Sequence, residues 1–142
     1  MFEQKIKLSK LAIDEGDDTI QFQFDFFNGI NSTSIDFYGY DDQFQNFAKE
    51  LCTFPKNIDS EVIYELGEQG EKWAYYILVR VFCYENNGHT AIQIKIDNNS
   101  KEPFKSFCEF YILTVPASIN KLGQLIKNWN PKIDKEIEWI AE

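Results

Sequence analysis

The sequence predicts an α+β fold, in which a largely antiparallel sheet of about 6–7 strands carries two amphipathic helices on one face and a short C-terminal helix follows. Alternating apolar and polar residues indicate the strands, and Asn-Gly pairs between them indicate hairpins. Two other segments repeat apolar residues at the helical spacing. The 13 Phe, 7 Tyr and 3 Trp favour pleated surfaces. A length of 142 residues fits a single domain over 1–142.

The first half of the chain predicts three strands, over Lys5–Ile13, Ile20–Phe26 and Ser32–Tyr40. An acidic turn, Asp14–Asp18, separates the first two strands. Asn28-Gly29 joins the second strand to the third, and this dipeptide is typical of a tight hairpin. The strand over Ile20–Phe26 alternates most regularly, so we expect one of its faces in the core and the other in water.

Each half also predicts one helix. The first begins at Asp42, with Gln45 as a capping-box partner, and ends before Pro55. The second is capped by Ser118. The apolar stripe of the first helix is Phe44, Phe47, Ala48 and Leu51, and that of the second is Ile119, Leu122, Leu125, Ile126 and Trp129.

The second half predicts four strands, over Glu61–Leu66, Trp73–Tyr84, His89–Asp97 and Ser106–Val115. The segment Trp73–Tyr84 is apolar at both odd and even positions, so we expect it in the middle of a sheet with both faces partly covered. The last isoleucines have helical spacing and predict the short final helix: Ile133, Ile137 and Ile140.

A strand followed by a helix occurs twice, over Ser34–Phe54 and Glu109–Trp129, with the apolar positions of the helices in phase. The halves otherwise differ, because the first supplies three predicted strands and the second four. We therefore expect a shared packing solution rather than a tandem repeat, with one helix from each half on the same sheet.

The composition restricts the possible partners. The net charge is −9, from 23 acidic and 14 basic residues, so the chain repels nucleic-acid phosphates and anionic lipid. We expect no nucleic-acid or membrane partner. A basic protein is the complementary partner, a homodimer is possible, and solubility alone is the other explanation of the acidity. Cys52, Cys83 and Cys108 are predicted to be buried free thiols. They indicate a reducing, cytoplasmic location, as does the absence of a signal-peptide pattern.

The sequence offers little for catalysis and predicts no catalytic residue, metal site or cofactor. The single histidine, His89, follows the Asn87-Gly88 turn, where a solvated residue is the simpler interpretation. The acids of Asp14–Asp18 lack the EF-hand pattern, and the glycines form no phosphate loop. A domain that uses carboxylates, either for small-ligand binding or for catalysis in a sheet-lined pocket, stays open as an alternative.

The remaining candidate is a surface for a protein partner. Tyrosine provides large, rigid contact area with a polar tip, and acidic residues nearby suit a basic partner. The competing interpretation is a second, smaller core layer formed by the same tyrosines. The predicted binding residues are Asp36, Tyr38, Tyr40, Tyr76, Tyr84, Glu109 and Tyr111.

Within Trp73–Trp129, the runs HTAIQIKI, EFYILTV and SINKLGQLIKNW are the basis of a resemblance. A small, acidic, aromatic-rich chain of hairpins with these runs resembles the α+β immunity proteins that neutralise bacterial polymorphic toxins. The resemblance implies a non-enzymatic inhibitor that occludes a basic toxin domain, with acidic residues steering association. It assigns no individual binding residue.

Overall fold

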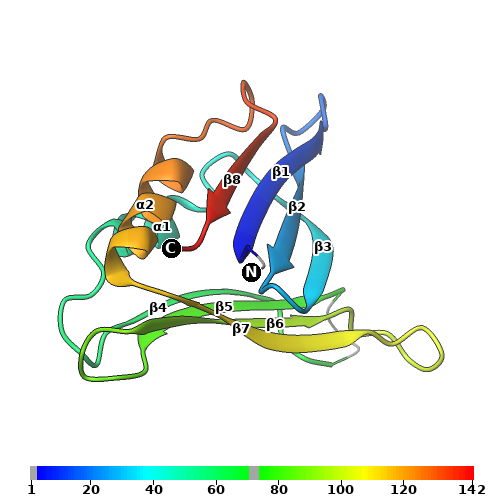
Figure 1. The fold of residues 1–142 in the computed structure, drawn as a ribbon. Coiled ribbons are helices and arrows are strands. Elements are labelled where there is room, and N and C mark those ends of the chain that lie inside the picture. The colour runs from blue at the N-terminus through cyan, green and yellow to red at the C-terminus, as the bar shows by residue number, and fades with distance from the viewer. Residues whose placement is uncertain (1–2, 71–73) are drawn as a thin grey trace.

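The computed structural model describes residues 3–70 and 74–142, and it folds into eight strands and two helices (Figure 1). Trp73, which the sequence places at the start of a strand, lies outside the described residues. The elements are β1 (Lys5–Ile13), β2 (Ile20–Phe27), β3 (Ser32–Gly39), α1 (Gln45–Cys52), β4 (Glu61–Leu66), β5 (Tyr76–Cys83), β6 (Thr90–Asp97), β7 (Phe107–Thr114), α2 (Pro116–Lys127) and β8 (Glu136–Ile140).

The strands form two antiparallel sheets rather than the single predicted one. Sheet A has the order β3-β2-β1-β8, and sheet B has the order β4-β5-β6-β7. Sheet A stands over sheet B in Figure 1, and the apolar faces of the two sheets are turned toward each other. The physical reason is that a half-buried sheet needs a cover, and a second sheet with an apolar face provides one as well as helices do. Alternation predicts the apolar faces but does not show which sheet each strand joins.

One continuous core fills the space between the sheets and the helices. Its centre is aromatic: the Phe44 ring lies 5.2 Å from the Phe22 ring and 5.2 Å from the Tyr64 ring, between centroids. Full burial of each such side chain contributes roughly 1.5–3 kcal/mol. The core therefore joins β2, α1 and β4 into one packed unit.

The helices pack against each other, with α1 also contacting β4 and α2 contacting β8. Their starts differ from the prediction. The capping box of Asp42 and Gln45 does not form, because the chain turns until Phe44 and Gln45 is the first residue of the helix, with no side-chain cap. Helix α2 begins at Pro116, whose ring suits a first turn, so Ser118 lies inside the helix and caps nothing. Among the described residues neither helix has the length and apolar character needed to cross a membrane.

The predicted C-terminal helix is wrong, because this segment is the strand β8, which pairs with β1. Ile133 and Ile140, two members of the expected helical stripe, are 77% and 45% exposed. The buried side chain is Trp139, and its indole nitrogen donates to the Ser118 carbonyl over 2.8 Å. Glu136-Ile137-Glu138-Trp139 alternates polar and apolar residues as a strand does, although the spacing of Ile133, Ile137 and Ile140 also fits a helix.

The two halves exchange one strand each. Each half runs strand-strand-strand-helix-strand, over β1 to β4 and β5 to β8. The fourth strand of each half joins the sheet of the other half: β4 pairs with β5, and β8 pairs with β1. The sequence predicts three strands in the first half and four in the second, whereas the structure has four in each. The prediction that both helices lie on one sheet is also wrong.

Candidate functional surface

The outer faces of the two sheets differ in character. On sheet A, the outward side chains pair with one another: Lys7 lies 3.4 Å from Glu136, and Gln23 donates to Asp36 over 2.9 Å. Ser34 donates to Asp25 on the same face. This outer face is a solvated, polar surface.

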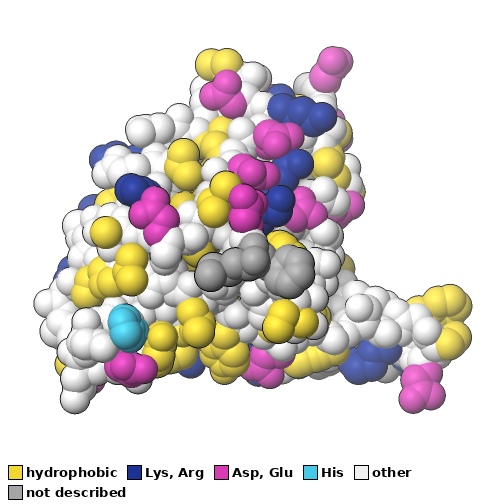
Figure 2. All heavy atoms as spheres, viewed as in Figure 1, with side chains coloured by type: hydrophobic (Ala, Val, Ile, Leu, Met, Phe, Trp, Pro, Cys, Tyr) yellow, Lys and Arg dark blue, Asp and Glu magenta, His cyan; other side chains and the backbone are white. Residues whose placement is uncertain are grey.

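The outer face of sheet B, which we call the sheet B face, combines exposed apolar side chains with charged ones such as Arg80, Lys95 and Glu109. The alternate residues Ile77, Val79 and Val81 point into the core, so their neighbours point outward. Figure 2 shows hydrophobic side chains along the lower margin of the molecule, over sheet B. The exposed apolar residues of this face are Ile63 (48%), Phe107 (41%), Tyr111 (42%), Leu113 (50%) and Val115 (37%).

A line of paired polar side chains crosses this face from edge to edge. Arg80 on β5 contacts Glu61 on β4 at 2.5 Å, and its Nε donates to Gln93 on β6 over 2.8 Å. Gln93 in turn donates to Glu109 on β7 over 2.7 Å. We call these four residues the polar diagonal. Because each partner fixes the next, the diagonal holds its side chains in place without a ligand.

Aromatic side chains pack directly on the polar diagonal. The Arg80 guanidinium lies 3.9 Å from the centroid of the Phe82 ring, and Phe82 contacts Tyr111 edge-on at 6.4 Å between centroids. A guanidinium over a ring is attracted to its negative face. The side chains of the polar diagonal are therefore held in place by their partners, and exposed apolar side chains lie on both sides of them.

The structure divides the seven predicted binding residues between different faces. Glu109 and Tyr111 lie on the sheet B face, and Tyr84 lies at the β5–β6 hairpin, where its ring is 6.0 Å from that of His89. Asp36 and Tyr38 belong to β3 in sheet A, and Tyr40 is exposed just beyond that strand.

Tyr76 is not available to a partner. It is only 8% exposed, and its hydroxyl donates to Glu65 over 2.6 Å. Burial and the neighbouring carboxylate raise the pKa of Tyr76 to about 12.

Sequence reasoning missed Ile63, Phe107 and Leu113. The strand β7 is apolar at both odd and even positions, so its pattern does not show which side faces water. Its register with β6 decides this, because Ile112 lies opposite the buried Ile92 and turns Tyr111 and Leu113 outward.

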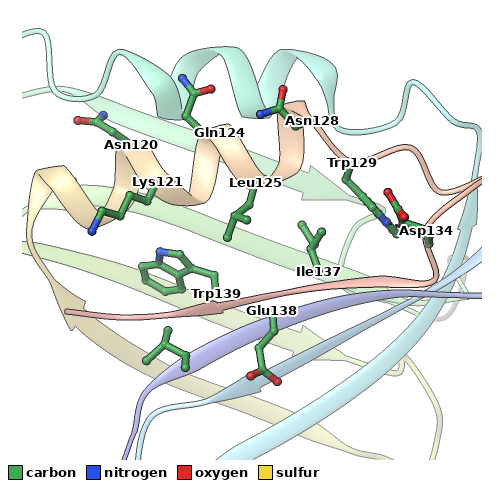
Figure 3. A pocket seen from close by; sticks show the side chains of 11 residues that line it. Asn120, Lys121, Gln124, Leu125, Asn128, Trp129, Asp134, Ile137, Glu138 and Trp139 are labelled. Atoms are coloured by element: carbon green, nitrogen blue, oxygen red, sulfur yellow. Dashed lines mark hydrogen bonds between the residues drawn. The ribbon is translucent and has the colours of Figure 1, made fainter.

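A groove of about 700 Å³ lies between α2 and β8 (Figure 3). Leu125 points down from the helix toward Ile137 on the strand, and Trp139 lies beside them. The amide of Asn120 at its rim already donates to the carbonyls of Leu51 and Phe54. Apolar side chains form most of the groove surface, polar and charged residues also line it, and the Asn120 amide is already used within the fold.

The acidic turn and the histidine have local roles. Asp14 and Asp17 accept hydrogen bonds from the backbone of Gly16 (2.7 Å) and Thr19 (3.0 Å). The bonds from Thr19 lower the pKa of Asp17. His89 is half exposed at the hairpin and lies 3.3 Å from Glu85.

Within residues 3–70 and 74–142, no group of three or more His, Cys, Asp or Glu side chains is placed to hold a metal ion. The three cysteines are free and half-buried, rather than fully buried as predicted.

No protein-family model, curated protein or solved structure matches this chain.

Proposed function

We propose that the chain is a non-enzymatic protein-binding domain and that its partner is a basic protein that docks on the sheet B face. The observation that supports this most directly is the exposure of Ile63, Tyr111 and Leu113 around a polar diagonal that is already ordered. Apolar and aromatic side chains grouped around fixed polar groups are typical of the centre of a protein interface.

Charge supports the choice of partner. The net charge of −9 attracts a basic protein over long range and speeds its association. On the sheet B face, Glu61 and Glu109 end the polar diagonal at the two sheet edges. Carboxylates at the edge of an apolar surface orient a basic partner without the cost of burying an unpaired charge.

The form of binding that the resemblance implies is inhibition, as in an immunity protein. In that form the sheet B face covers the working surface of a basic toxin domain. The chain itself performs no chemistry, so the effect depends only on affinity and on the surface covered.

The test begins with capture of partners by the immobilised chain from an extract of the organism that encodes it. Binding of the captured protein is then measured with Leu113→Arg, which places a cation in the apolar patch and repels a basic partner. We expect a basic partner, at least about tenfold weaker binding to this variant, and weaker binding at high salt.

Tyr38→Arg is the matched control, because it adds the same charge at an exposed aromatic residue on sheet A. We expect this control to bind like the unmodified chain. Equal binding by all three proteins, or a captured partner without basic character, rules out the proposed surface.

A further inference from the structure

Strand β8 has a free edge whose backbone groups point away from β1. The backbone N–H of Lys10 donates to the Lys135 carbonyl, and that of Ala141 donates to the Gln4 carbonyl, both over 2.8 Å. In an antiparallel pair the groups facing the partner alternate along each strand. The N–H and C=O groups of Glu136, Glu138 and Ile140 therefore face the free side. Among the described residues, β1 is the only strand that pairs with β8.

The free edge opens onto the groove beside α2. In Figure 3, β8 lies between β1 and α2, so the edge looks toward the helix. Leu125 on the helix is 37% exposed, and with Ile137 it lines the groove with apolar surface. A strand placed along this edge gains backbone hydrogen bonds on one side and apolar contacts for every second side chain.

The charge around the groove favours a basic occupant. Three charged residues line it: Asp134, Glu138 and Lys121. The ammonium of Lys121 is already 3.0 Å from Glu142, whereas the Glu138 carboxylate lies 4.0 Å from the ammonium of the exposed Lys5. Pairing of β8 with a second copy of itself in the centred antiparallel register sets Glu138 against Glu138, and like charges directly opposite are destabilising.

The molecule itself shows a sequence that pairs well with β8. On the other edge, β1 presents Lys5 opposite Ile140 and Lys7 opposite Glu138, with Ile6 and Leu8 turned into the core. Lys5 and Lys7 form ion pairs with Glu138 and Glu136. Alternation of lysine with an aliphatic residue thus matches both faces of β8.

We propose that the free edge of β8 binds an extended segment of another protein, in which basic and aliphatic residues alternate, and that this segment pairs antiparallel with β8 as a fifth strand of sheet A, as β1 does on the other edge. The basic side chains lie beside Glu136 and Glu138 on the outer face. The aliphatic side chains enter the groove against Leu125. This site is separate from the sheet B face and does not depend on it.

A labelled peptide, Lys-Ile-Lys-Leu-Lys-Ile, tests the proposal by fluorescence anisotropy with the unmodified chain. Methylation of the backbone nitrogen of the central lysine removes an N–H that faces β8. Methylation of the leucine nitrogen removes one that faces away. We expect the first change to weaken binding at least about tenfold and the second to weaken it less than about twofold.

Two protein variants test the same edge from the other side. Glu138→Pro removes the N–H that faces the groove while the β1 ladder, which uses Ile137 and Trp139, stays intact. Glu138→Gln keeps that N–H and is the matched control. We expect peptide binding to be lost with proline, and to be reduced only severalfold and to become less salt-dependent with glutamine. Circular dichroism checks that both variants are folded.

Several results overturn the proposal. These are no binding of the peptide, equal effects of the two methylations, or binding unaffected by Glu138→Pro. A dimer in solution that Glu138→Pro dissociates assigns the edge to a second copy instead. Leu113→Arg is expected to leave peptide binding unchanged, so failure of this proposal and failure of the proposed function are distinguishable.

Discussion

At the scale of single residues, Asp97 organises the turn between β6 and β7. It is 4% exposed, and its carboxylate accepts from the Asn99 backbone over 2.8 Å and lies 3.6 Å from the Lys105 ammonium. Burial alone raises the pKa of Asp97, but the hydrogen bonds from Asn99 and Gln69 and the charge of Lys105 outweigh it and hold this pKa below its usual value. The ionised form is thus the one that the fold stabilises.

The sign of the pH dependence follows from that lowered pKa. The contribution of Asp97 to stability is present above the unfolded-state pKa of about 3.9 and is lost as pH falls through the lower folded-state pKa. We expect Asp97→Asn to reduce the free energy of unfolding by roughly 1–3 kcal/mol at neutral pH, and by progressively less below about pH 4. Urea unfolding of both proteins between pH 7 and pH 3 measures this difference in the free energy of unfolding.

The exposed Asp59→Asn is the control for a change of one carboxylate to an amide, and we expect little effect from it at any pH. A difference between Asp97→Asn and the unmodified chain that stays constant from pH 7 to pH 3 contradicts this role for the carboxylate.

At the scale of elements, Gly123 sets the distance between the helices. A Cβ at this position lies 2.7 Å from the Cys52 backbone nitrogen and 3.0 Å from the Ala48 carbonyl oxygen. Both atoms belong to the backbone of α1, so they cannot turn aside as a flexible side chain does. The contact between α1 and α2 therefore requires glycine here.

We expect Gly123→Val to lower the free energy of unfolding by roughly 1–3 kcal/mol, because the helices must move apart. Gly123→Ala is expected to destabilise too, although alanine is favoured over glycine by about 1 kcal/mol within a helix. The neighbouring exposed Gln124→Ala is the control, with a change within about 0.5 kcal/mol. Stabilisation by Gly123→Ala in urea unfolding would show that the helices have room between them.

Most elements were predictable from local pattern, but their partners were not. The strands at Lys5–Ile13 and Glu61–Leu66 match β1 and β4 at both ends. The predicted start of α1 at Asp42 was wrong, because residues 41–44 form turns and bring Phe44 into the core between Phe22 and Tyr64, which lie far apart in the sequence. The last segment fits a helical pattern through three isoleucines and a strand pattern through Glu136–Ile140, and its pairing with β1 makes it a strand. In both cases contacts with residues distant in the sequence determine the local structure.

The candidate surface shows the same limit. Glu109 and Tyr111 were predicted as binding residues from their residue types, and the register of β7 with β6 turns them to the outer face. Which of the seven predicted residues share a face could not be predicted. A single sheet, as predicted from the sequence, places Asp36 and Glu109 on one face. Division into two sheets sends Asp36 to sheet A and Glu109 to sheet B.

At the scale of the whole molecule, the exchanged strands couple the two halves. Sheet A needs β8 from the second half, and sheet B needs β4 from the first. The core is also continuous across both sheets. Neither half therefore has a complete sheet or a closed core by itself.

We expect one cooperative unfolding transition, with coincident curves from tryptophan fluorescence and far-ultraviolet circular dichroism. The fragments 1–70 and 71–142 are expected to be unfolded alone and to recover sheet structure when mixed. Two separated transitions, or a folded single fragment, would contradict this coupling. An unrelated unfolded peptide in place of either fragment is the control for the mixing experiment.

The pairing of β8 with β1 also has a consequence for synthesis on the ribosome. The edge of β1 that β8 covers stays open while more than a hundred residues are added to the chain, which takes on the order of ten seconds. During that time β1 presents an unpaired strand edge, and Ile6 and Leu8 lack the contacts with β8 that help to bury them in the folded protein. Lys5 and Lys7 on that strand place like charges against the same edge of another copy, which disfavours pairing between two chains that are being synthesised on one messenger RNA.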